Sequence, residues 1–137
     1  MATTPPADAA ETSAAALLIT PGIYEEKIVV PADKPFITLS GSKANSTILT
    51  GNDSGNIIES ATLTVLASDF VGRYLTIQNT FRKHGVEVVA LRISGDRVAF
   101  FGCRILGYQD EAGRHYYRNC YIEGAVDFIC GNAASLF

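Results

Sequence analysis

The stretch that decides the fold is residues 103–127, CRILGYQDEAGRHYYRNCYIEGAVD, because it contains one phrase twice. The phrase C-x-I-x-G-x-x-D ends at Asp110 and again, 17 residues later, at Asp127. A degenerate third copy stands 28 residues before the first, in YLTIQNTFR, where Leu75 replaces the cysteine. Copies at unequal offsets are typical of a solenoid, in which the strands recur and the loops between them vary in length.

The repeat predicts which residues become neighbours. Equivalent residues of adjacent coils lie one strand spacing apart, about 4.8 Å, so we expect Cys103 under Cys120 and Asp110 beside Asp127. Each of two adjacent carboxylates raises the cost of ionising the other, so one can stay protonated as an acid while its neighbour acts as nucleophile or base. The alternative is that aspartate is simply a common turn residue at the end of a strand. The repeat alone leaves both interpretations open.

The rest of the chain predicts an all-β fold in one domain. Short runs rich in Ile, Val, Thr, Phe and Tyr are separated by Gly, Asn, Asp and Ser, and no long stretch has a helical period. A length of 137 residues with 47% hydrophobic content suits a single core. We interpret residues 1–16 as a flexible leader rich in Ala, Thr and Pro, and residues 17–137 as a partial solenoid domain.

Charge and composition exclude several classes of protein. The net charge of −3 argues against a nucleic-acid binder, and no apolar run approaches the roughly 18–20 residues that span a bilayer. The charge is uneven, at −4 up to Ser68 and +1 from Asp69 onward. An attraction for anionic ligands is therefore expected in the C-terminal half. Three cysteines and two histidines at these spacings suggest no metal site.

Four blocks of sequence carry a resemblance to a known family. They are GIYEEKIVVP at residues 22–31, VVALRISGDRVAFFGC at 88–103, GYQD at 107–110 and GAVDFICGNAA at 124–134. In this order they resemble the signature blocks of plant pectin methylesterases, and the similarity runs from about Leu17 to the last residue.

The resemblance implies a fold, an activity and a location. The fold is a right-handed parallel β-helix, here incomplete. The activity is hydrolysis of the methyl esters of galacturonate units in pectin, without a metal or cofactor, by an enzyme secreted to the cell wall. The partners implied are pectin and, by family analogy, a proteinaceous pectinesterase inhibitor. No nucleic acid and no membrane is implied.

The resemblance also assigns roles to individual residues. Asp127 matches the nucleophile, Asp110 matches the general acid that later acts as base, and Gln109 matches an oxyanion-hole donor. These residue types suit the chemistry, because an ionised carboxylate attacks the ester carbonyl while a protonated one donates to the departing methanol. Tyr108 and Phe128, which adjoin these positions, are candidates for contact with the sugar.

The chain departs from the family pattern near these positions. Glu87 stands where the family has a second oxyanion-hole glutamine, and a carboxylate there has no proton to donate. The sequence given ends before the family's LGRPW block, which supplies an arginine and a tryptophan to the site. Two interpretations therefore remain, an active pectinesterase-type ester hydrolase or a truncated, inactive relative that at most binds pectin.

Cys103 and Cys120 are candidates for a disulfide. If they stack on adjacent coils, their Cα separation falls within the 4.4–6.8 Å that a disulfide spans. A secreted protein favours the bond, and otherwise both are buried cysteines of the ladder.

Overall fold

The computed structural model describes residues 15–52, 60–81, 88–124, 126–128 and 134–136, and for 110, 111, 126–128 and 134–136 it describes the backbone alone. These residues form sixteen short strands and no helix. No helix long and apolar enough to cross a membrane occurs among them. The prediction of an all-β chain is confirmed.

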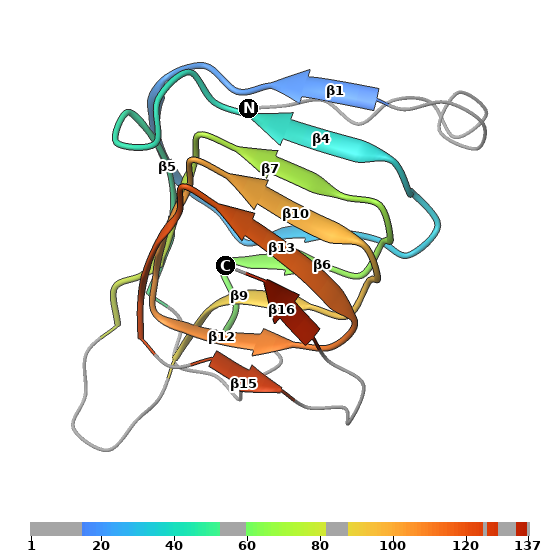
Figure 1. Cartoon of the computed structure of the whole chain (residues 1–137). Coiled ribbons are helices and arrows are strands. Elements are labelled where there is room, and N and C mark those ends of the chain that lie inside the picture. The colour runs from blue at the N-terminus through green and yellow to red at the C-terminus, as the bar shows by residue number, and fades with distance from the viewer. Residues whose placement is uncertain (1–14, 53–59, 82–87, 125, 129–133, 137) are drawn as a thin grey trace.

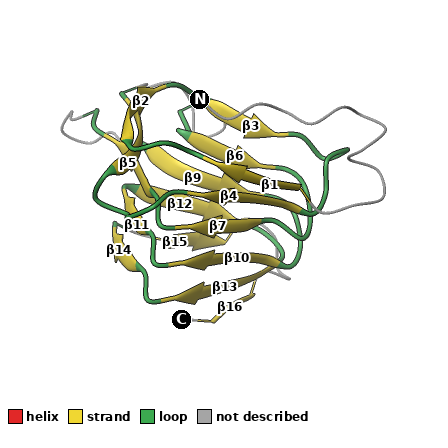
Figure 2. Cartoon of the chain, turned by 90° about the horizontal axis from the view of Figure 1, so that it is seen from above, coloured by secondary structure: helices red, strands yellow, loops and turns green. Residues whose placement is uncertain are grey.

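The strands stack into three parallel sheets, because each coil contributes one strand to each sheet (Figure 1, Figure 2). Sheet A contains, in order, β1 (Ala15–Leu18), β4 (Ile37–Ser40), β7 (Val71–Arg73), β10 (Val98–Phe101), β13 (Arg114–Arg118) and β16 (Ala134–Leu136). Sheet B contains β2 (Gly22–Glu25), β5 (Thr47–Gly51), β8 (Thr76–Asn79), β11 (Arg104–Leu106) and β14 (Tyr121–Glu123). Sheet C contains β3 (Ile28–Val30), β6 (Leu63–Val65), β9 (Val89–Ile93), β12 (Tyr108–Glu111) and β15 (Val126–Phe128).

The order of strands defines a parallel β-helix. All pairings are parallel and join strands of successive coils, with the right-handed crossover that nearly all parallel connections take. Ile105 pairs with Ile77 on one side and Ile122 on the other, so the three copies of the phrase stack in the predicted register.

The core fills the inside of the coils with ladders of aliphatic residues. Leu49, Ile77 and Ile105 follow one another in sheet B, and Leu63 and Leu91 pair in sheet C, all with no exposed surface. Full burial of each such side chain contributes about 1.5–3 kcal/mol to stability. The residues between them point outward, which is why a period of two appears in the sequence.

A glycine in each of the two full copies of the phrase turns the chain from sheet B into sheet C. Gly107 and Gly124 have φ angles of 135° and 121°, which favour glycine. A Cβ on Gly124 would lie 2.3 Å from the carbonyl oxygen of Gly107. The phrase therefore contains glycine because two coils approach closely at this corner.

The structure differs from the sequence interpretation in one element boundary and in the setting of the two aspartates. Strand β1 begins at Ala15, so the predicted leader overlaps the first strand by two residues. Asp110 and Asp127 lie within β12 and β15 and not in turns, so the interpretation of both as turn residues is wrong. The sequence did not show this because GYQD contains turn-forming residues, whereas pairing with the neighbouring coils extends the strand through it.

Candidate active site

The two repeated aspartates occupy partner positions on adjacent strands of sheet C. Asp110 of β12 is the register partner of Asp127 of β15. The predicted adjacency is therefore present in the backbone, one strand spacing of about 4.8 Å apart. Residues that share a register position in parallel strands lie on the same face of the sheet. The fold thus supplies a position where two carboxyl groups can act on one substrate.

Arg92 continues the same ladder on the other side of Asp110, and the sequence analysis missed it. Arg92 of β9 is the register partner of Asp110, and its side chain is half-buried between the buried neighbours Leu91 and Ile93. A signal existed in the sequence, because Arg92 precedes Asp110 by 18 residues, close to the 17 that separate the two aspartates. A register shift between Tyr108 and Gln109 hides this alignment from a search at constant period.

Gln109 is fully buried, and its amide is partly engaged within the protein. It pairs with the core residue Leu91, and its Nε2 donates a hydrogen bond to the carbonyl oxygen of Gly107. Its Oε1 has no hydrogen-bond partner within the part of the chain that the structure describes. A buried amide oxygen without a partner is costly. The Nε2 group carries two N–H donors, so the bond to Gly107 occupies one of them and leaves the other for a further acceptor.

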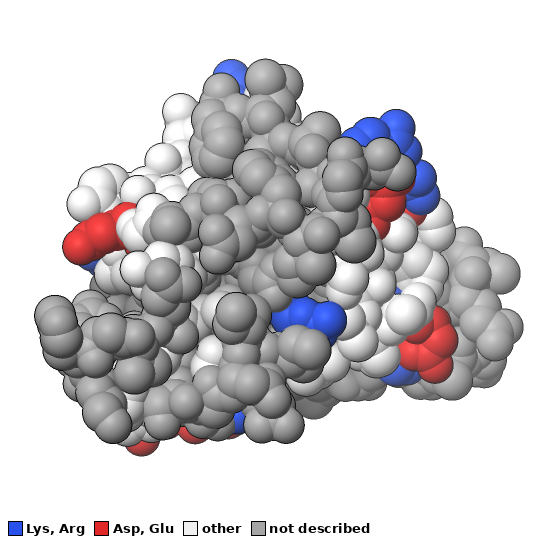
Figure 3. Space-filling view, turned by 90° about the horizontal axis from the view of Figure 1, so that it is seen from below, with Lys and Arg blue, Asp and Glu red and all other residues white. Residues whose placement is uncertain are grey.

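The remaining predicted substrate contacts are only partly visible. Tyr108 begins β12 opposite Val89 and is half-buried. The backbone of Phe128 lies in β15, opposite Glu111. Glu87 lies outside the described residues. Seen from below, where β12 and β15 lie, the described charged side chains form separate small groups of both signs (Figure 3).

The cysteines of the repeat stack on adjacent coils, as predicted, at the corner between sheets A and B. The amide of Tyr121, the residue after Cys120, donates to the carbonyl oxygen of Cys103 at 2.9 Å. Both thiols are free in the structure. A hydrogen bond from the Cys103 thiol lowers the pKa of Cys120 to about 7, while this contact and burial raise the pKa of Cys103. The disulfide itself stays a prediction.

Among the described carboxylates, those with resolved pKa shifts lie at another corner, between sheets C and A. Hydrogen bonds from Arg114, at 2.6 Å from Asp96, hold the pKa of Asp96 well below its usual range. Arg97 does the same for Asp69 through two bonds of 2.7 and 2.9 Å. All four side chains are at least partly exposed, and their pairing links successive coils. We interpret this network as structural.

A polar hollow of about 540 Å³ opens at the corner between sheets B and C on the earlier coils. Its lining residues are Glu25, Glu26, Lys27, Thr50, Gly51, Asn52, Ser60, Thr62 and Thr80. Its wall is held by internal hydrogen bonds, such as Thr62 to the carbonyl oxygen of Gln78 at 2.7 Å and Asn79 to that of Ser60 at 2.9 Å.

No group of three or more His, Cys, Asp or Glu side chains suited to a metal ion occurs in the described ranges.

Comparison with known proteins gives consistent matches. The family model described as Pectinesterase matches residues 4–137. The Arabidopsis thaliana protein named "Putative pectinesterase 11" is 57% identical over 123 residues, which cover 87% of this chain and 35% of that protein. The solved pectin methylesterase from carrot is 35% identical with a TM-score of 0.80, over 90% of this chain and 41% of that one.

A further solved structure is a pectin methylesterase in complex with a hexasaccharide. It is 27% identical to this chain with a TM-score of 0.76, and the match covers 96% of this chain and 48% of that one. The chain thus spans less than half the length of each of these relatives.

Proposed function

Because the chain belongs to the pectinesterase family, we propose that it carries part of the catalytic centre of an enzyme that removes methyl esters from pectin. The observation that supports this most directly is the in-register pairing of Asp110 with Asp127. A pair of carboxyl groups at one strand spacing can divide the roles of nucleophile and acid, because each disfavours ionisation of the other.

The proposed reaction has two steps. Ionised Asp127 attacks the carbonyl carbon of the galacturonate methyl ester, and protonated Asp110 gives its proton to the departing methanol. The acyl group is then bonded to Asp127. Asp110, now ionised, takes a proton from water, whose oxygen attacks the acyl carbon and releases both the free galacturonate and the Asp127 carboxylate. No metal or cofactor enters these steps.

Gln109 is the proposed donor to the oxyanion of both steps. In the structure one N–H of its amide donates to the Gly107 carbonyl oxygen, which holds the side chain in place, and we propose that the second N–H donates to the oxyanion. Its unpaired Oε1 leaves the amide free to adjust when substrate binds. Glu87 supplies no second donor when ionised, and the loss of one oxyanion-hole donor typically costs a factor of about 10² to 10³ in rate.

Arg92 is the proposed electrostatic partner of the pair. A cation at the register position next to Asp110 favours ionised carboxyl groups in its surroundings. It thereby stabilises the negative charge that Asp110 takes on once its proton has gone to methanol, and it opposes the rise in pKa that the pair imposes on one of its two members.

The proposed substrate is methyl-esterified polygalacturonate of the cell wall, reached by secretion. The bound hexasaccharide of the solved relative supports an oligosaccharide ligand for the family. Tyr108 and Phe128 are proposed to line the sugar site, and a pectinesterase inhibitor stays a prediction from the family alone.

The test is methanol release from highly methylated pectin by the purified chain, after circular dichroism has confirmed a β-rich fold. Asp127→Asn and Asp110→Asn are the variants, and Glu123→Gln, a nearby exposed carboxylate, is the matched control. The proposal predicts release by the parent and the control and none by either aspartate variant. Absence of release from folded parent protein favours the inactive relative, and release that survives both aspartate substitutions contradicts the mechanism.

A further inference from the structure

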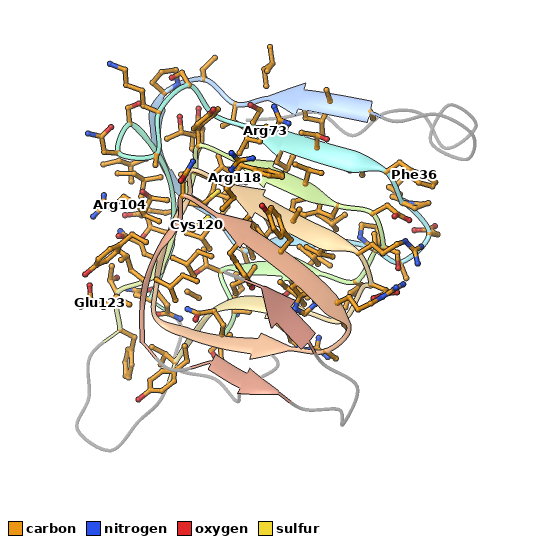
Figure 4. All side chains as sticks on the ribbon, in the orientation of Figure 1. Phe36, Arg73, Arg104, Arg118, Cys120 and Glu123 are labelled. Carbon is orange, nitrogen blue, oxygen red and sulfur yellow. The ribbon has the colours of Figure 1, made fainter. Side chains whose placement is uncertain are left out.

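A ladder of arginines and an aromatic ring runs along the outer face of sheet A, away from the aspartate pair. Arg73 of β7, Phe101 of β10 and Arg118 of β13 are successive register partners at the ends of their strands. Figure 4 labels Arg73 and Arg118 on sheet A, with Arg104 at the neighbouring corner. Arg73 and Arg118 are exposed, and Phe101 is half-buried.

No described carboxylate neutralises the positive charge of this ladder. Within the described part of the chain, neither Arg73 nor Arg118 lies within 4.0 Å of a carboxylate oxygen. Arg97 and Arg114, at the opposite ends of the strands, are committed to Asp69 and Asp96 instead. The strands β4, β7, β10 and β13 contain no acidic residue. Among the described residues, the outer face of sheet A therefore presents cationic side chains and no carboxylate.

Aromatic side chains lie between and beside the charges. The Arg73 guanidinium carbon is 5.4 Å from the centre of the Phe101 ring, and the ring of Tyr116 is 5.7 Å from that of Phe101. Tyr74, which follows Arg73 at the corner, is 46% exposed. Aromatic rings provide an apolar surface for the C–H face of a sugar, and guanidinium groups form paired hydrogen bonds with carboxylates.

The spacing suits a linear polyanion better than a single small anion. Arg73 and Arg118 are two strands apart, which corresponds to about 10 Å along the stack. A chain of uronic acid units carries one carboxylate on each ring, so it can place separate carboxylates on the two arginines and a ring near Phe101. A methyl ester is neutral and cannot form these ion pairs.

We propose that the outer face of sheet A is a binding surface for demethylated polygalacturonate, with Arg73 and Arg118 as its anion contacts and Phe101 as its stacking surface. The identity of the polymer rests on the proposed function, whereas its class, an acidic polysaccharide, rests on the charge and rings of this face. The surface would bind the product of the reaction on a face other than that of the aspartate pair.

The experiment measures binding of the full chain to polygalacturonate and to fully methylated pectin by isothermal titration calorimetry at low salt. R73A/R118A is the test variant, and K27A/K34A, which removes two positive charges from the connections before and after β3, is the matched control. R73K/R118K keeps the charge, and circular dichroism verifies that each variant folds.

We expect R73A/R118A to weaken binding of polygalacturonate by at least about 10-fold, because two charge-assisted contacts are lost. K27A/K34A should bind within about 2-fold of the parent, and R73K/R118K should lie between because lysine lacks the paired donors. Equal losses in both alanine variants, or equal affinity of the parent for methylated pectin, would overturn the proposal.

Two separate readouts distinguish this inference from the proposed function, because methanol release depends on Asp127 whereas the proposed binding to sheet A depends on Arg73 and Arg118. If methanol release is never observed but the arginine-dependent binding persists, only the proposed hydrolysis fails. If release depends on Asp127 but R73A/R118A binds the polymer as the parent does, only the surface on sheet A fails.

Discussion

Oxidation of the stacked cysteines should raise stability by an amount that the structure allows us to calculate. Cys103 and Cys120 are adjacent on neighbouring coils, and both thiols are free. A bond between them closes a loop of 18 residues, counted with both cysteines. The chain-entropy relation then gives about 3 kcal/mol of stabilisation at 25 °C, through restriction of the unfolded chain.

The reaction itself should depend on pH in a defined direction. The pKa of Cys120 is lowered to about 7 by the hydrogen bond from Cys103, so the thiolate that starts exchange becomes abundant as the pH rises through 7. We expect exchange with oxidised glutathione to speed up over this range. Modification by iodoacetamide should occur first at Cys120, since Cys103 is almost completely buried.

The assay is urea unfolding of the Cys130→Ser protein, which removes the third thiol, in its reduced and oxidised forms. Mass spectrometry must first show loss of two hydrogens and a cross-link between the two peptides. With m values of about 1–3 kcal/mol/M, 3 kcal/mol moves the midpoint by roughly 1–3 M. The C103A/C120A variant should show no response to oxidant. A confirmed cross-link that leaves the midpoint unchanged would refute the argument, as would thiols that never oxidise.

Three other predictions concern the corners and the site. Gly124→Ala should lower the free energy of unfolding by about 1–3 kcal/mol, because the φ angle is positive and the added Cβ would lie 2.3 Å from the carbonyl oxygen of Gly107. In the same urea assay, the control Glu123→Ala should change the free energy of unfolding by no more than about 0.5 kcal/mol. Asp96→Asn should be less stable than the parent at neutral pH, and the gap should close in acid, because a lowered pKa contributes stability that is lost as the pH falls below the ordinary aspartate value. Arg92→Met should move the acidic limb of the methanol-release profile to higher pH, since loss of the cation disfavours the ionised carboxyl groups; an unchanged profile would exclude Arg92 from the pair's environment.

The sequence predicted the stacking of the repeat because its physical cause is local. Apolar residues at every second position must face one core, and the glycine before each aspartate fixes the corner, so the register of Ile77, Ile105 and Ile122 follows from the pattern. The neighbouring positions of Asp110 and Asp127 follow for the same reason.

What the sequence could not predict depends on contacts between coils. Arg92 enters the aspartate ladder only because the register shifts by one residue at Tyr108, which no repeat period encodes. The hydrogen bond of Gln109 to Gly107 depends on the corner geometry. The alignment of Arg73, Phe101 and Arg118, by contrast, follows the offsets of 28 and 17 that the repeat already has, so it could have been found from the sequence by extending the repeat to the preceding strand.

The parallel stacking of the coils has a mechanical consequence. Hydrogen bonds between coils run along the stack, and each strand is held by the coil before it and the coil after it. A force that pulls one end of the chain while the other end is held should therefore unfold one coil at a time. The length of chain released in each event reports the number of residues in that coil. We expect about 60 Å for the 17 residues between paired positions of β10 and β13, and about 115 Å for the 33 residues between those of β4 and β7. The unequal loops give each coil its own signature in a force-extension trace.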